Sequence, residues 1–103
     1  MTPTQRSMEL LRKEGYHVEV VEKWNSFTKT RKDLWGFVDL LAIRRDEVLG
    51  VQVTSGSNIS ARRRKIADHE HVGKVREAGI RIELHGWLKS DNGRYLVKRE
   101  DLS

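Results

Sequence analysis

The sequence predicts an α/β fold, with a mixed β-sheet flanked by helices in the order αβββαββ. Short apolar runs rich in Val, Ile and Leu are typical of strands, and two longer segments carry residues typical of helix ends. The second of these segments lies between the third and fourth predicted strands, where a helix must cross over the sheet. The chain has 103 residues, so we expect a single domain over residues 1–103.

The N-terminal third predicts a helix, a strand and a loop. Thr2-Pro3-Thr4-Gln5 is typical of a capping box and Gly15 of a helix end, which together predict a helix over residues 3–14. A β-branched run predicts a strand over 16–24. The polar segment 25–34 predicts a loop that is mobile without a ligand.

Two apolar runs in the middle of the chain predict a central hairpin. Each run, over residues 37–43 and 48–54, is interrupted by a single polar side chain, which is typical of strands buried on both faces. The short charged segment between them predicts a tight connection. Residues 55–58 are rich in Ser, Gly and Asn, and predict a turn that caps the next helix.

The last part of the chain predicts the crossover helix and two more strands. Charge density and alanine content predict a helix over 60–77, ended by a glycine. Residues 80–84 alternate as a strand does, and residues 87–88 either extend that strand or begin a loop. The tight-turn sequence at 91–93 then leads into a short final strand over 94–98.

Composition limits the class of protein. The chain has no cysteine, which excludes disulfides and thiolate zinc sites and favours an intracellular, cytoplasmic protein over a secreted one. No apolar run reaches the roughly 18–20 residues of a membrane helix, so we expect no membrane partner. The net charge of +5 favours a polyanionic partner such as nucleic acid.

The two polar interruptions of the central hairpin are Asp39 and Gln52. An acid within an apolar strand is costly unless it is paired, protonated or bound to a cation. If the turn is centred on residues 45–46, Asp39 faces Gln52 and Phe37 faces Thr54. Carboxylate and amide oxygens suit Mg²⁺, which completes its shell with water and substrate phosphate. The pattern therefore predicts a hard-cation site that acts on phosphate.

Asp39 followed by Gln52-Val53-Thr54 resembles the D…(E/Q)xK core of the PD-(D/E)XK nuclease superfamily. Glu9, on the first predicted helix, is similar in position to the helical glutamate of archaeal-type Holliday junction resolvases. The resemblance covers roughly residues 5–85, and implies a restriction-endonuclease-like fold. It also implies that Asp39, Gln52 and the Val53 carbonyl bind Mg²⁺ or Mn²⁺, with Glu9 as a second carboxylate.

The lysine position of that motif is Thr54 in this chain. Because threonine carries no charge, the resemblance implies that Thr54 orients water while a neighbouring cation offsets transition-state charge. Lys65 and Arg62 on the next helix, or Lys29 and Lys32 in the loop, are the candidates. The expected catalytic set is Glu9, Asp39, Gln52, Thr54 and Lys65.

Basic and aromatic side chains predict the nucleic-acid contacts. Asp33 is either a further acid at the site or a loop cap, and Trp35 either stacks on a base or packs at the loop base. A basic run on a helix is also typical of a solvated face. His69 and His71, two apart on a predicted helix, are expected at the surface without a shared metal. The predicted contacts are Lys29, Arg31, Lys32, Trp35, Arg62, Arg63, Arg64 and Lys65.

These residues predict a Mg²⁺-dependent endonuclease for DNA, and branched or junction DNA by resemblance. Resolvases of this type are dimers because two strands are cut symmetrically, so a homodimer is expected. The small size suits a bacterial or bacteriophage genome-maintenance protein. Two alternatives remain, namely a non-catalytic nucleic-acid-binding module on the same fold and a subunit that binds other proteins.

Overall fold

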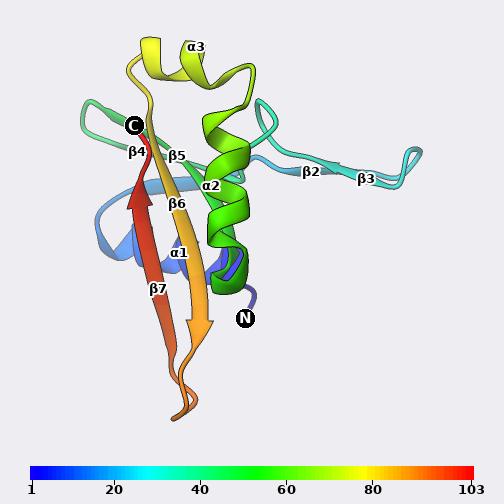
Figure 1. Ribbon diagram of the computed structural model, residues 1–103. Helices are drawn as coiled ribbons and strands as arrows, with labels where there is room; N and C mark the ends of the chain where they lie inside the picture. Colours follow the sequence, from blue (N-terminus) through cyan, green and yellow to red (C-terminus); the bar gives the residue numbers. More distant parts are fainter.

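A mixed five-stranded sheet organises the chain (Figure 1). The computed structural model describes all residues from Met1 to Ser103. Strand β5 pairs in parallel with β6, whereas the other neighbours in the sheet are antiparallel. The predicted α/β class with a mixed sheet is therefore confirmed. In sheet order the strands are β1 (His17–Val20), β4 (Leu40–Arg44), β5 (Glu47–Ser55), β6 (Arg81–Lys89) and β7 (Tyr95–Asp101).

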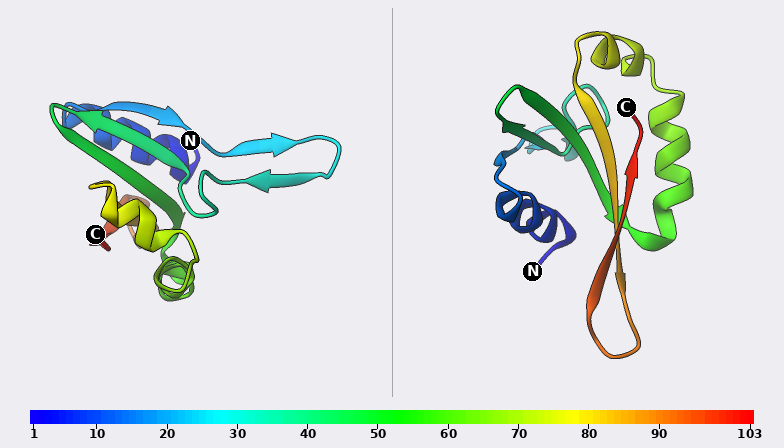
Figure 2. Two further views of the ribbon diagram at one scale, coloured as in Figure 1. Left: turned by 90° about the horizontal axis from the view of Figure 1, so that it is seen from above. Right: turned by 90° about the vertical axis from the view of Figure 1, so that its left-hand side faces the viewer.

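Helices cover both faces of this sheet (Figure 2). Helix α1 (Pro3–Lys13) lies on one face, and its predicted capping box between Thr2 and Gln5 is present. The other face carries a short 3₁₀ turn, η1 (Gly56–Asn58), followed by α2 (Ile59–Ala67) and α3 (Val72–Glu77). None of these helices combines the length and apolarity that crossing a membrane requires.

Two apolar cores lie between the sheet and the helices, one on each face of the sheet. Strand alternation explains the division, because successive residues of β4, β5 and β6 point to opposite faces. The core under α1 contains Leu11, Tyr16, Val18, Leu40, Ala42, Leu49 and Val51. The core under α2 and α3 contains Phe37, Val38, Ile59, Ile66, Val72, Val75, Ile82 and Leu84.

A second, two-stranded sheet replaces the loop predicted over 25–34. Strands β2 (Lys23–Asn25) and β3 (Thr30–Lys32) form a hairpin that projects from the body (Figures 1 and 2). The Asn25 side chain accepts hydrogen bonds from the backbone N–H groups of Phe27 and Thr28, and Lys29 adopts a left-handed φ of 54°. This local turn chemistry closes the hairpin without any apolar pattern in the sequence.

The helix predicted over 60–77 is wrong as a single element, because the structure breaks it between Ala67 and Val72. At about 100° per residue, one straight helix would put Val75 some 180° around from Ile66. The break lets Ile66 and Val75 pack into the same core. Ala61, in the first turn of α2, is exposed.

Strand boundaries also differ from those predicted. The predicted strand 16–24 is divided, since β1 ends at Val20 and β2 begins at Lys23. Strand β4 begins at Leu40 rather than Phe37, because Leu34 and Val38 bridge across a tight turn. Strand β6 runs through residues 87–88, which resolves the alternative left by the sequence.

Candidate metal and nucleic-acid site

The register of the central hairpin brings Asp39 and Gln52 together. Leu40 pairs with Val51 and Arg44 with Glu47, as the predicted turn centre requires. One residue beyond the ladder, Gln52 Nε2 donates to Asp39 Oδ2 at 2.8 Å. The predicted juxtaposition is therefore confirmed. The pairing of Phe37 with Thr54 is absent from the ladder, because Phe37 lies in the turn before β4.

Three carboxylates converge at this point, and we call Glu22, Asp33 and Asp39 the acidic cluster. One oxygen from each lies within 4.8 Å of the others. Glu22 directly precedes β2 and Asp33 directly follows β3, so the base of the projecting hairpin delivers two of the three acids. Asp39 is buried, whereas Glu22 and Asp33 are half-buried.

Asp39 has the most perturbed environment of the three. Burial raises the pKa of its carboxyl group, hydrogen bonds from the Val53 N–H and the Gln52 amide lower it, and nearby Asp33 raises it again. The net effect is a pKa of about 7. A bound cation would reverse this balance by favouring the ionised carboxylate.

Two basic side chains border the acidic cluster. Lys65 Nζ, from α2, lies 3.9 Å from Asp33 Oδ2. Arg31 Nη1, from β3, lies 3.4 Å from Glu22 Oε1. The site thus combines acids that attract a metal with cations that attract phosphate, which is the charge pattern of phosphoryl-transfer sites.

Gln52 supplies a further oxygen. Its side chain is 3% exposed, and its Oε1 is buried with no hydrogen-bond partner. An unpaired buried carbonyl oxygen is costly unless a ligand or ion satisfies it. Because the amide already touches Asp39, this oxygen lies beside the acidic cluster.

Comparison with protein-family models, curated proteins and solved structures found no match for this chain. The candidate site therefore rests on its own geometry.

Glu9 and the Val53 carbonyl were predicted as metal ligands, but neither contacts the acidic cluster. Glu9 lies on the exposed side of α1, beside Lys13 at 4.0 Å, and α1 covers the opposite face of the sheet from Gln52. Val53 contacts Asp39 through its backbone N–H, at 2.8 Å, and the contact does not involve the expected carbonyl. Thr54 is buried two residues beyond Gln52, on the same face of β5.

The four basic residues 62–65 of α2 do not share one partner. Arg63 forms a bidentate pair with Glu100 of β7, at 2.7 and 2.6 Å, which holds it away from other anions. Arg62 and Arg64 have no ion-pair partner within 4.0 Å, and Lys65 borders the acidic cluster. The run therefore provides separate contacts, and not a continuous basic surface.

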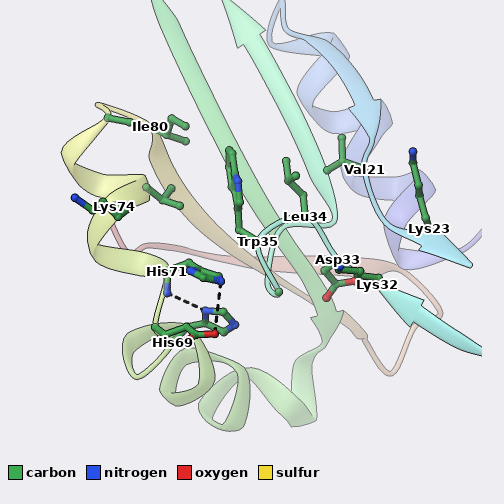
Figure 3. Close-up of a pocket in the computed structure, with 14 residues that line it drawn as sticks. Val21, Lys23, Lys32, Asp33, Leu34, Trp35, His69, His71, Lys74 and Ile80 are labelled. Atoms are coloured by element: carbon green, nitrogen blue, oxygen red, sulfur yellow. Dashed lines mark hydrogen bonds and ion pairs between the residues drawn. The ribbon is translucent and has the colours of Figure 1, made fainter. Parts of the chain in front are cut away.

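A pocket of about 770 Å³ adjoins the acidic cluster through Asp33 (Figure 3). Lys32 and Trp35 line it, as do His69 and His71. The sequence predicted both histidines on one helix. In the structure they lie in the break between α2 and α3, and their ring centroids are 5.3 Å apart. His71 is exposed, as expected, and His69 is half-buried. Its Nδ1 accepts the backbone N–H of His71.

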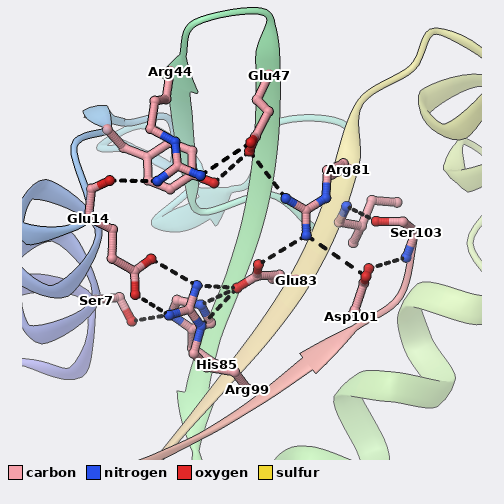
Figure 4. A network of polar contacts seen from close by, with 12 residues as sticks. Ser7, Glu14, Arg44, Glu47, Arg81, Glu83, His85, Arg99, Asp101 and Ser103 are labelled. Atoms are coloured by element: carbon pink, nitrogen blue, oxygen red, sulfur yellow. Dashed lines mark hydrogen bonds and ion pairs between the residues drawn. The ribbon is translucent and has the colours of Figure 1, made fainter.

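A buried Ser–His–Glu arrangement lies on the opposite face of the sheet (Figure 4). Ser7 Oγ lies 2.9 Å from His85 Nδ1, and His85 Nε2 lies 2.9 Å from Glu83 Oε1. Ser7 and His85 are both 0% exposed, and Trp87 Nε1 donates to Ser7 Oγ at 2.8 Å. Because a substrate cannot reach a serine this buried, we interpret this arrangement as structural.

The sequence interpretation missed Glu22 and left Asp33 undecided. Glu22 lies within the predicted strand 16–24, and Asp33 follows two basic residues, so neither stands out locally. A hairpin between them is the feature that brings both to Asp39. Recognising Asn25 as a turn residue would have given the signal.

Proposed function

We propose that this protein is a divalent-cation-dependent endonuclease that hydrolyses phosphodiester bonds in DNA. The observation that carries this proposal is the meeting of three carboxylates within 4.8 Å, beside a buried glutamine oxygen without a partner. The antiparallel β1-β4-β5 run followed by a parallel β6 lends further support, since it is compatible with the resemblance to PD-(D/E)XK nucleases.

The donor set fits a hard cation. Glu22, Asp33 and Asp39 offer carboxylate oxygens, and rotation of the Gln52 amide would turn its unpaired oxygen toward the same point. Such a set suits Mg²⁺ or Mn²⁺ better than softer metals. When bound, the ion polarises a phosphate oxygen and lowers the pKa of a bound water.

The remaining side chains bind and orient the phosphate. Lys65 takes the role of the missing motif lysine, because its ammonium group lies 3.9 Å from Asp33 and can offset charge on the phosphate. Arg31 pairs with Glu22 and helps to hold the DNA backbone beside the acidic cluster. Thr54 orients water from the same face of the sheet as Gln52.

The alternative function is a non-catalytic nucleic-acid-binding module. Thr54 at the motif's lysine position and Glu9 outside the acidic cluster favour it. Both functions use the same basic side chains to bind DNA, so DNA binding does not distinguish them. Metal-dependent cleavage does.

The deciding experiment is a cleavage assay with labelled linear, single-stranded and four-way-junction DNA, with Mg²⁺, Mn²⁺ or EDTA. We expect cleavage that EDTA abolishes and that Asp39→Asn, Asp33→Asn and Glu22→Gln each reduce by at least about a hundredfold. The matched control is Glu9→Gln, an exposed carboxylate that should leave cleavage unchanged. DNA binding without cleavage under any metal would establish the alternative, and loss of cleavage in Glu9→Gln would reject the acidic cluster as the metal site.

The proposal includes a homodimer, because symmetric cutting of two strands needs two sites. Light scattering measures it directly. A homodimer has twice the 12.0 kDa mass of one chain, and a mass of 12.0 kDa for the protein alone would remove this part of the proposal.

A further inference from the structure

The pocket beside the acidic cluster, which we call the side pocket, has an apolar interior and a basic rim. Its volume of about 770 Å³ lies in the range of small-ligand sites. Val21 and Leu34 line it on the hairpin side, and Val75 and Ile80 on the α3 side. Trp35 stands between these walls (Figure 3).

Trp35 is held in an unusual backbone conformation. Its φ is 55°, which a bulky residue rarely adopts, and Gly36 follows at φ 85°. The turn is fixed from both ends, since Leu34 and Val38 exchange two backbone hydrogen bonds of 2.9 Å. His69 packs so closely that a Cβ on Gly36 would lie 2.3 Å from its Nε2. The surrounding structure therefore keeps the indole at the side pocket, at a cost in backbone strain.

Two lysines on the rim occupy paired positions of the hairpin, and neither has a counterion. Lys23 and Lys32 are directly paired across the β2–β3 hairpin, and both line the side pocket. Directly opposed like charges destabilise a hairpin. Neither lysine has a carboxylate within 4.0 Å. An anion placed between them would remove this repulsion, which indicates a phosphate at the mouth of the side pocket.

We propose that the side pocket binds an unpaired nucleotide of a nucleic acid strand. The base lies against Trp35 and the apolar walls, and Lys23 and Lys32 hold its phosphate. Asp33 belongs both to the side pocket and to the acidic cluster, so the next phosphodiester along the strand lies at the acids. This placement rests on the proposed function and narrows its substrate to DNA with an unpaired nucleotide at the cleavage point, as in a single strand or at a branch. A base held in a duplex cannot enter, because its edge and faces are occupied.

The test is a binding measurement in EDTA, which needs no catalysis. The probes are a single-stranded oligonucleotide of about 12 nucleotides, its blunt duplex, and an oligomer of the same length in which every nucleotide is abasic. We expect the single strand to bind at least about tenfold more tightly than either of the others. Trp35→Asn keeps a residue that tolerates positive φ, and should remove most of that preference.

Paired lysine variants test the phosphate contact. The double variant Lys23→Ala/Lys32→Ala should bind the single strand more weakly. The slope of log affinity against log salt concentration should become shallower by about 0.7 for each lysine removed. The matched control is Lys89→Ala with Lys98→Ala, which removes the same charge from the distant β6–β7 hairpin and should bind as the wild type does. Equal affinity for single strand and abasic oligomer, or unchanged binding by Trp35→Asn, would overturn the side pocket as a nucleotide site.

The two proposals can fail separately. Single-strand binding that depends on Trp35, without cleavage under any metal, would leave the side pocket in place and reject the nuclease. Metal-dependent cleavage that Asp39→Asn abolishes, together with DNA binding that Trp35→Asn does not change, would support the nuclease and reject the side pocket as a nucleotide site.

Discussion

Asp39 links the stability of the fold to pH. Its folded-state pKa of about 7 exceeds the roughly 3.9 of an unfolded aspartate, so between these values the folded state holds the extra proton. The stabilisation is complete below about pH 4 and is lost as pH rises through about 7. We expect the wild type to lose a few kcal/mol of unfolding free energy over this range, relative to Asp39→Asn, when divalent cations are absent.

Urea denaturation of both proteins between about pH 4 and pH 8 measures this difference. Other carboxylates, such as Glu47 and Glu83, have lowered pKa values and make stability depend on pH in the opposite sense. The quantity to follow with pH is therefore the unfolding free energy of the wild type minus that of Asp39→Asn. Adding Mg²⁺ at pH 8 should restore the unfolding free energy of the wild type and leave that of Asp39→Asn unchanged. Parallel pH curves for the two proteins would contradict the raised pKa.

Gln52→Glu would place a fourth carboxylate against Asp39. The wild-type amide donates to Asp39 Oδ2 at 2.8 Å, whereas an ionised glutamate cannot donate and would repel it. We expect the metal-free variant to lose on the order of 2 kcal/mol of unfolding free energy at neutral pH. Calorimetric melting should show a larger rise in melting temperature on adding Mg²⁺ than the wild type shows. Gln52→Leu is the uncharged control, and its melting temperature should rise less than that of the wild type because only the three carboxylates remain. An equal gain in wild type and Gln52→Glu would exclude Gln52 from the metal site.

Side chains whose positions follow from strand register were predictable, and those delivered by a distant loop were not. Asp39 and Gln52 could be paired because two apolar runs and one tight turn fix the hairpin register. Glu22 and Asp33 depend on a polar hairpin that has no alternating pattern. Glu9 was assigned from its position in the chain, and sequence position does not tell which face of a sheet a helix covers.

The β2–β3 hairpin projects from the body of the molecule, so we expect the fold to tolerate its shortening. Phe27 at its tip is 97% exposed, and residues 23–32 carry four basic side chains and no acid. Replacing Asn25–Thr30 by Asn-Gly would close a two-residue turn between Trp24 and Arg31, which are already paired. We expect the unfolding free energy to change by less than about 0.5 kcal/mol. DNA affinity should fall several-fold, because Lys29 and the tip aromatic are removed.

Fluorescence anisotropy with labelled DNA and urea denaturation measure the two effects. Lys29→Ala and Phe27→Ser separate the contribution of charge from that of the aromatic ring. A loss of more than about 2 kcal/mol in the shortened protein would mean that the hairpin packs on the body, against its exposure.

The crossover helix shows how tertiary packing overrides a local pattern. Residues 60–77 have the charge and alanine content of one helix, and the sequence gives no glycine or proline before Gly73 to divide it. The core under α2 and α3 decides the outcome, since Ile66 and Val75 cannot both reach it from a straight helix. Side-pocket residues His69 and His71 lie in the resulting break, which no local signal predicts.

A polar network ties the N-terminal helix to the sheet across the whole molecule (Figure 4). Ser7 of α1 contacts His85 and Trp87 of β6, and Arg99 of β7 bonds to Glu83 of β6 and Glu14 next to α1. Burial would raise the pKa of Glu83, but the hydrogen bonds from His85 and Arg99 outweigh it and lower the pKa. Glu83 is therefore a carboxylate that holds residues distant in sequence together.

Ser7→Ala tests whether this network is structural or catalytic. The substitution removes the oxygen that accepts from Trp87 Nε1 at 2.8 Å and lies 2.9 Å from His85 Nδ1, which leaves two buried polar groups unsatisfied. We expect a loss of about 1–3 kcal/mol in unfolding free energy by urea denaturation. Ser60→Ala, an exposed serine of α2, should cost less than about 0.5 kcal/mol. Since Ser7 is 0% exposed, neither protein should hydrolyse a small ester, and ester hydrolysis by the wild type that Ser7→Ala abolishes would instead make the network a catalytic one.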